Sequence, residues 1–129
     1  MKQKNFSIKK RMQSFKYAFN GLRTLLCEEH NSWIHLFIAV CVVAAGFVFN
    51  ISTLEWIAVT LCIGMVFALE LVNTAIENLA DFVSKEYHEL IKKVKDLTAA
   101  AVLIAAIAAA IIGLIIFVPK IIKLVCYTS

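Results

Sequence analysis

Residues 54–81 decide the fold, and they read LEWIAVTLCIGMVFALELVNTAIENLAD. An apolar run over residues 56–69 is followed by four polar residues at helical spacing, Glu70, Asn73, Glu77 and Asp81. At about 100° per residue, offsets of 0, 3, 7 and 11 place these side chains on one narrow face of a helix. A carboxylate inside a membrane costs about 2.5–3.5 kcal/mol on insertion scales, so such residues usually mark function. The stretch therefore predicts a membrane helix with one polar, functional face.

Composition also points to a membrane. Of the 129 residues, 61% are hydrophobic and 17% are charged, whereas an ordinary soluble domain is about 45–50% apolar. Once the apolar stretches lie in lipid, a chain this short has little left for a second, water-facing core. We therefore expect a single domain over residues 1–129 that works at the bilayer.

Three stretches are apolar enough to cross the bilayer, namely residues 33–50, 54–79 and 97–118. At about 1.5 Å per residue, each approaches or exceeds the roughly 30 Å of hydrocarbon. The turn at residues 50–53 is so short that it permits only an antiparallel helical hairpin. Pro119 should end the third helix, because proline lacks the backbone hydrogen that continues a helix.

The N-terminal segment, residues 1–32, mixes basic and apolar side chains. Phe15, Phe19, Leu22 and Leu26 recur at offsets of 0, 4, 7 and 11, which predicts an apolar stripe on a helix. We interpret the segment as an amphipathic helix on the membrane surface. It is too polar for a signal-peptide core and should stay in the mature protein. The predicted fold class is an all-α membrane protein with three transmembrane helices and this surface helix.

Charge asymmetry predicts how the chain is oriented. Seven basic residues precede the first span, four lie within residues 82–96, and none lies in the first hairpin turn. Because cytoplasmic segments carry an excess of Lys and Arg, the N-terminus and a loop over residues 82–96 should be cytoplasmic. The net charge of +4 suits anionic headgroups or a nucleotide and does not suggest nucleic acid as a partner.

Polar residues near the cytoplasmic face could hold a nucleotide. Carboxylates from two helices with a lysine nearby are what a magnesium-bound polyphosphate requires, since Mg²⁺ prefers one or two carboxylates plus phosphate oxygens and water. Phosphoryl transfer then needs mainly positioning and charge neutralisation. Glu70 lies deeper and could reach a lipid hydroxyl, while Glu77, about 10.5 Å along the helix, could hold the metal of the nucleotide.

Taken singly, these residues have plainer explanations. Asn73 could form a hydrogen bond between helices, a contribution that averages about 0.6 kcal/mol in membranes. His35 would be a packing residue, and His88 an ordinary exposed histidine. Four charged residues could simply be solvated at the interface, Glu29, Asp81, Glu86 and Lys95. Two rival classes also remain, a transporter with Glu70 as a proton-coupled gate and a structural membrane adaptor.

The polar pattern resembles a known family. ELVNTAIENLAD at residues 70–81, EYHEL at residues 86–90 and the pair Lys95-Asp96 are similar to the signature of the small bacterial integral membrane kinases, which include diacylglycerol kinase and undecaprenol kinase. The resemblance extends from Tyr17 to Lys120. It implies a homotrimer in the bacterial inner membrane, with composite active sites between protomers. It also implies transfer of the γ-phosphate of ATP to a lipid alcohol with Mg²⁺.

The resemblance further implies roles by position. Glu70 matches the catalytic base, and Glu29 and Glu77 match the metal ligands. The nucleotide-binding positions are Lys10, Tyr17, Glu29, Glu77, Glu86, His88, Lys95 and Asp96. Asn73 and Asp81 would shape the site.

The substrate branch rests on shorter segments. EHNSWIH at residues 29–35 and IGLIIFVPK at residues 112–120 look more like the undecaprenol kinases. The diacylglycerol kinases carry a basic residue just after the first hairpin turn, where this chain has Glu55, but YHEL at residues 87–90 resembles those enzymes. Undecaprenol is therefore favoured modestly over diacylglycerol.

Overall fold

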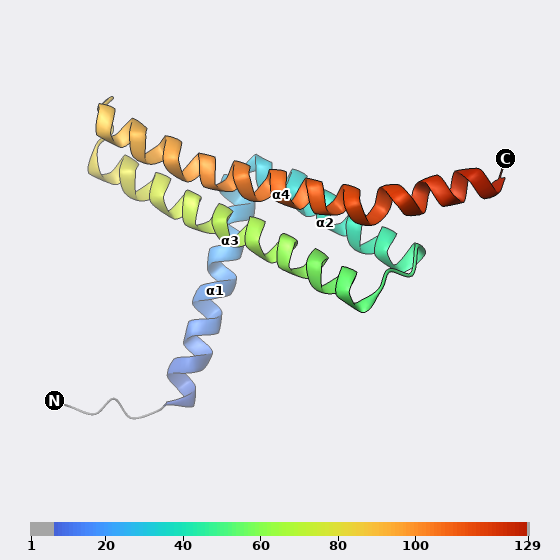
Figure 1. Ribbon diagram of the computed structural model, residues 1–129. Helices are drawn as coiled ribbons and strands as arrows, with labels where there is room; N and C mark the ends of the chain where they lie inside the picture. The colour runs from blue at the N-terminus through green and yellow to red at the C-terminus, as the bar shows by residue number, and fades with distance from the viewer. Residues whose placement is uncertain (1–6, 129) are drawn as a thin grey trace.

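The computed structural model describes residues 7–128, and all regular structure in that range is helical. The four helices are α1 (Ile8–Glu28), α2 (His30–Val48), α3 (Thr53–Val83) and α4 (Glu89–Thr128). Figure 1 shows α2, α3 and α4 alongside one another, with α1 leaving them at a steep angle. The last three helices are each long and apolar enough to cross a membrane, which confirms the predicted all-α class and its three spans.

A tight turn joins α2 to α3. Asn50 adopts φ = 50°, the left-handed region that asparagine tolerates better than most residues. Ser52 then starts α3 with a capping box, because its hydroxyl accepts from the Glu55 N–H at 3.2 Å and the Glu55 carboxylate accepts from the Ser52 N–H at 3.0 Å. Gly46 lies directly against the Trp56 indole, where an added Cβ would come within 2.6 Å of a ring carbon. The two helices therefore approach closely at this end.

The junction between α1 and α2 is held by side-chain hydrogen bonds to backbone carbonyls. The buried Ser32 hydroxyl donates to the Glu29 carbonyl at 2.6 Å, and Trp33 Nε1 donates to the Leu26 carbonyl at 2.6 Å. Glu29 itself has extended backbone and separates the two helices. Its carboxylate is thereby placed where α1, α2 and α3 meet. Residues 1–6, the start of the segment expected to be amphipathic, lie outside the described part of the chain.

The prediction that Pro119 ends the last helix is wrong, because α4 continues through it to Thr128. A proline removes one backbone hydrogen bond, but a membrane helix tolerates this where neighbouring groups satisfy the freed atoms. Next to the proline, Lys120 Nζ donates to the Ile116 carbonyl at 3.3 Å and to Glu55 Oε2 at 2.7 Å, which ties this part of α4 to α3. The helix changes direction in this part instead of ending (Figure 1).

The loop expected over residues 82–96 is shorter in the structure. Only residues 84–88 lie outside helices, because α3 extends to Val83 and α4 begins at Glu89. Charged residues on these ends pair along and between the helices, as Lys92 does with Asp96 at 2.6 Å and Lys95 with Asp81 at 2.6 Å. Hydropathy marks where the lipid ends and not where the helix ends, so the predicted spans 54–79 and 97–118 are shorter than α3 and α4.

Candidate active site

Glu70 is the buried carboxylate of the helix pair α2–α3, with 6% of its surface exposed. One oxygen, Oε1, is hydrogen-bonded to Nδ1 of His35 on α2. The other oxygen, Oε2, has no hydrogen-bond partner within residues 7–128, and the same is true of Thr74 Oγ1 and Asn73 Oδ1. Buried polar atoms are nearly always satisfied in native structures. These three atoms therefore mark a place suited to a polar group from outside the protomer.

Glu29 and Glu77 form the second part of the site. Burial raises the pKa of Glu29 above its ordinary value, and the charge of Glu77, a hydrogen bond with Glu77 and the charges of Glu70 and Glu28 add to the effect. Glu77 also accepts from Asn73 Nδ2 at 3.5 Å. Three carboxylates, one from the α1–α2 junction and two from α3, thus interact in one negative cluster.

This cluster fits a magnesium ion carried by a nucleotide. Within the described range, no group of three or more His, Cys, Asp or Glu side chains is arranged to enclose a metal by itself. Mg²⁺, however, usually takes one or two carboxylates together with phosphate oxygens and water. Glu29 and Glu77 supply two carboxylates, and their mutual repulsion is what a cation would relieve.

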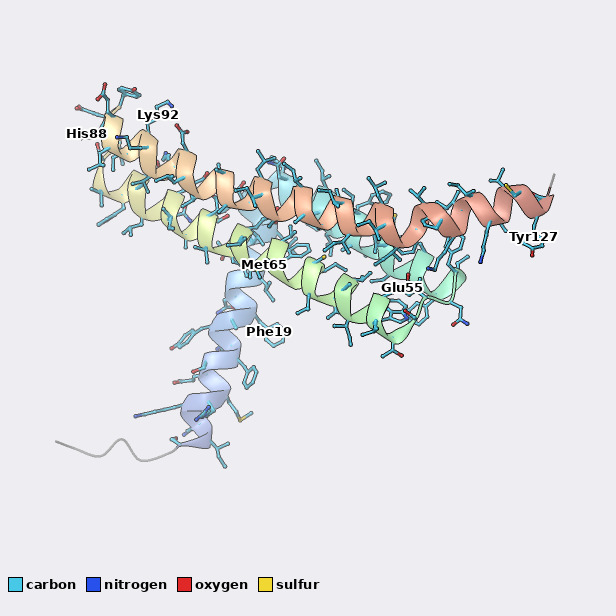
Figure 2. All side chains as sticks on the ribbon, in the orientation of Figure 1. Phe19, Glu55, Met65, His88, Lys92 and Tyr127 are labelled. Atoms are coloured by element: carbon cyan, nitrogen blue, oxygen red, sulfur yellow. The ribbon has the colours of Figure 1, made fainter. Side chains whose placement is uncertain are left out.

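The remaining polar groups of the α3–α4 end are tied to one another. Lys95 Nζ lies 2.6 Å from Asp81 Oδ1, so the two predicted positions form one ion pair between α3 and α4. Asp96 is held by Lys92 at 2.6 Å, and the exposed His88 accepts from the Leu90 N–H through Nδ1 at 3.1 Å. Figure 2 shows His88 and Lys92 at the end of the helices remote from Glu55. The exposed Glu86 lies in the turn between the two helices.

Lys10 and Tyr17 are placed differently. Both lie on α1 and are exposed, with 67% of the surface of Tyr17 accessible. Because α1 leads away from the other helices (Figure 1), the single chain does not bring these two positions to the carboxylate cluster. The predicted site is thus assembled in one protomer for Glu29, Glu70 and Glu77, but not for α1.

His35 was assigned to packing by the sequence, whereas the structure places it against Glu70. The spacing of the two residues in the sequence contains a signal for this contact. Residues 35 and 70 lie about equally far from the turn at residues 50–53, so an antiparallel hairpin brings them to the same level. A single polar residue at that level of the first span is then a natural partner for the carboxylate.

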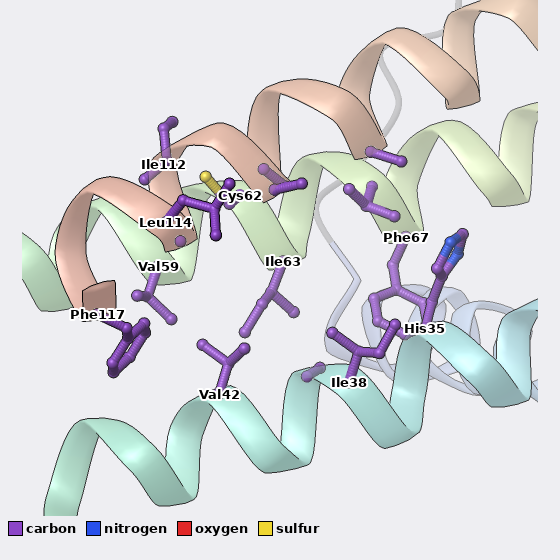
Figure 3. A pocket seen from close by; sticks show the side chains of 16 residues that line it. His35, Ile38, Val42, Val59, Cys62, Ile63, Phe67, Ile112, Leu114 and Phe117 are labelled. Atoms are coloured by element: carbon purple, nitrogen blue, oxygen red, sulfur yellow. The ribbon is translucent and has the colours of Figure 1, made fainter. Parts of the chain in front are cut away.

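An apolar pocket of about 370 Å³ adjoins this pair between α2, α3 and α4. Figure 3 shows His35 at one end of the pocket, beside Phe67 and Ile38, with Phe117 at the other end. Alanines of α4, among them Ala106 and Ala109, form part of its wall. A hydrocarbon chain suits such a lining, and the polar end of the pocket is the end nearest Glu70.

Comparison with known proteins gives a consistent result. Residues 16–117 match the profile of the family described as prokaryotic diacylglycerol kinase. The chain is 41% identical over 108 residues to an undecaprenol kinase of Bacillus subtilis, covering 84% of this chain and 88% of the relative. It is 38% identical over 112 residues to a diacylglycerol kinase of Synechocystis sp., covering 86% of this chain and 64% of that protein. It is 32% identical over 94 residues to a diacylglycerol kinase of Haemophilus influenzae, covering 73% and 80%.

Proposed function

The chain belongs to the prokaryotic diacylglycerol kinase family of ATP-using membrane lipid kinases, and we propose that the lipid it phosphorylates is undecaprenol. The observation that carries the substrate assignment is the 41% identity to an undecaprenol kinase over most of both chains. The segment around His35 supports it, since residues 29–35 resemble that branch in sequence.

In the proposed reaction Glu70 is the general base. Its unpartnered oxygen Oε2 accepts the proton of the lipid hydroxyl, the hydroxyl oxygen bonds to the γ-phosphorus of ATP, and the bond to the leaving ADP breaks. The burial of Glu70 supports this role, because a base for a membrane-embedded alcohol must lie at the depth of its hydroxyl. The pocket beside His35 would keep the reacting end of the lipid away from water.

Glu29 and Glu77 would hold the magnesium ion of the nucleotide. When bound, Mg²⁺ neutralises charge on the phosphate oxygens. Asn73 and Asp81 would shape the site, Asn73 by donating to Glu77 and Asp81 by holding Lys95. The further nucleotide contacts would come from Lys10, Tyr17, Glu86, His88, Lys95 and Asp96.

The proposal extends to assembly and orientation. A homotrimer would let α1 of one protomer carry Lys10 and Tyr17 to the carboxylate cluster of its neighbour, which the exposed position of α1 supports. We place α1 on the surface of a bacterial cytoplasmic membrane as an amphipathic helix, in one domain with the three spans. The N-terminus and the turn at residues 84–88 would be cytoplasmic.

Diacylglycerol is the second candidate, because two of the relatives compared are diacylglycerol kinases and YHEL at residues 87–90 resembles that branch. The test is transfer of phosphate from γ-labelled ATP by purified protein in mixed micelles with Mg²⁺, with undecaprenol and diacylglycerol offered separately. We expect the unmodified protein to transfer the label to undecaprenol, and we expect Glu70→Gln to transfer none. Labelling of diacylglycerol alone would reassign the substrate, and labelling of neither lipid by folded protein would overturn the proposal.

A further inference from the structure

The contact between His35 and Glu70 joins two helices at the base of the site. His35 Nδ1 is hydrogen-bonded to Glu70 Oε1, and the two side chains are 25% and 8% exposed. The residues are 35 positions apart in the chain, so the bond is a tertiary contact and not a consequence of helix geometry. Because of this contact Oε1 of Glu70 has a hydrogen-bond partner, whereas Oε2 has none within residues 7–128.

We propose that His35 is a positioning residue for Glu70. A carboxylate that acts as the base must be ionised and can only accept hydrogen bonds, so in that state the imidazole would donate its Nδ1–H to Oε1. Because this bond holds Oε1, it also fixes the orientation of Oε2, which has no partner within the described chain. The inference rests on the proposed role of Glu70 as the base and adds the residue that aims it.

On the side of the pair that faces the pocket, His35 is the one strong donor among the described residues. Among the residues that line the pocket beside the pair, only His35 and Cys62 carry a side-chain N–H, O–H or S–H group, and a thiol is a weak donor. Without His35 the carboxylate would lose the donor that faces it from α2 and would be freer to rotate about its last side-chain bond. A misplacement of about 1 Å at a reacting group can cost about 100-fold in rate.

The test compares three substitutions that differ in where they place a donor. In His35→Asn the amide nitrogen can occupy about the position of Nδ1, in His35→Gln it lies one bond farther out, and in His35→Leu there is none. His30→Leu is the matched control, because His30 is an exposed histidine at the start of α2. Each variant is assayed for kcat and for KM of ATP and lipid, with whichever lipid the unmodified protein phosphorylates, and its helicity is measured by circular dichroism.

We expect kcat to fall about 10- to 100-fold in His35→Leu with KM for ATP unchanged, to recover in His35→Asn, and to stay low in His35→Gln. His30→Leu should match the unmodified protein. A full kcat in His35→Leu, or a change confined to KM, would overturn the inference. If His35→Leu does not fold, the comparison of Asn with Gln decides, because equal activities contradict a role for the Nδ1 donor. The choice of lipid does not enter these outcomes, so failure of the undecaprenol proposal is seen separately in the unmodified protein.

Discussion

Burial and the neighbouring carboxyl of Glu77 hold the pKa of Glu29 above its ordinary value of 4.5, which links the α1–α2 junction electrostatically to α3. A raised pKa means that the protonated form is favoured in the folded protein. Its contribution to stability is complete below pH 4.5 and is lost as the pH rises through the raised value. Once Glu29 is ionised it repels the neighbouring carboxylates, and a bound cation would relieve that repulsion.

The first prediction concerns the pH dependence of stability. Without Mg²⁺, the Tm of the protein in detergent should decrease as the pH rises from 4.5 towards neutrality, and Mg²⁺ with a nucleotide should reduce the decrease. Glu29→Gln should flatten the profile, because it removes the titrating group. Thermal unfolding followed by circular dichroism across this pH range measures the effect. A profile that is the same in Glu29→Gln would show that another group is responsible.

The second prediction separates the base from the metal ligands. Glu70→Gln should lower kcat by about 100- to 10,000-fold, the usual contribution of a general base, while nucleotide binding persists. Glu77→Gln should weaken binding of the magnesium nucleotide itself, because it removes one of the two carboxylates proposed to hold the metal. Equilibrium binding of a fluorescent ATP analogue, measured beside turnover, distinguishes the two. Loss of nucleotide binding in both variants would contradict the division of roles.

The third prediction concerns sites shared between protomers. Lys10 lies on α1, away from the carboxylate cluster of its own chain, so Lys10→Ala and Glu70→Gln should complement each other when co-assembled. A mixed oligomer then contains some sites with both functional residues, and activity should exceed the sum of the two separate variants. The control is a chain carrying both substitutions, mixed with Glu70→Gln. Activity no higher than the sum would argue that each protomer works alone.

The fourth prediction tests the close approach of α2 and α3. Gly46→Ala should destabilise the protein by about 1–3 kcal/mol, because the new methyl group would meet the Trp56 ring at 2.6 Å. Gly64→Ala is the control, since no neighbouring atom lies within 4 Å of the position that its methyl group would occupy. Unfolding by a denaturing detergent measures both. Equal stability of the two variants would mean that the hairpin can open without cost at this point.

Much of this fold was predictable from composition and spacing. The apolar stretches predicted three spans because lipid requires long apolar helices, and the polar stripe from Glu70 to Asp81 lies on α3. The helix ends were harder to predict from the sequence. Charged residues such as Lys92 and Lys95 extend α4 beyond its apolar part, where they pair with Asp96 and Asp81. The effect of the proline inside α4 was also predicted wrongly, since it depends on neighbours that one chain segment does not specify.

The sequence proposes the residues of the candidate site, but it does not predict the contacts among them. The spacing brought Glu70, Asn73 and Glu77 to one face, and the resemblance assigned their roles. Asn73 and Glu77 pair within α3, but the partner of Glu70 is His35 of α2, and that contact depends on the register of the hairpin. Whether α1 serves its own chain or a neighbour is a property of the assembly, which spacing along one chain does not encode.

If Lys95 binds the nucleotide as proposed, its ion pair with Asp81 makes nucleotide binding competitive. In the proposed complex the phosphates of ATP must take Lys95 from a carboxylate that already holds it at 2.6 Å. Binding at this position would thus exchange one anion for another. A ligand with little negative charge would gain little binding free energy over the Asp81 carboxylate. A polyphosphate carries more negative charge than the Asp81 carboxylate and would displace it from Lys95. Asp81 could then interact with the cation bound to the polyphosphate.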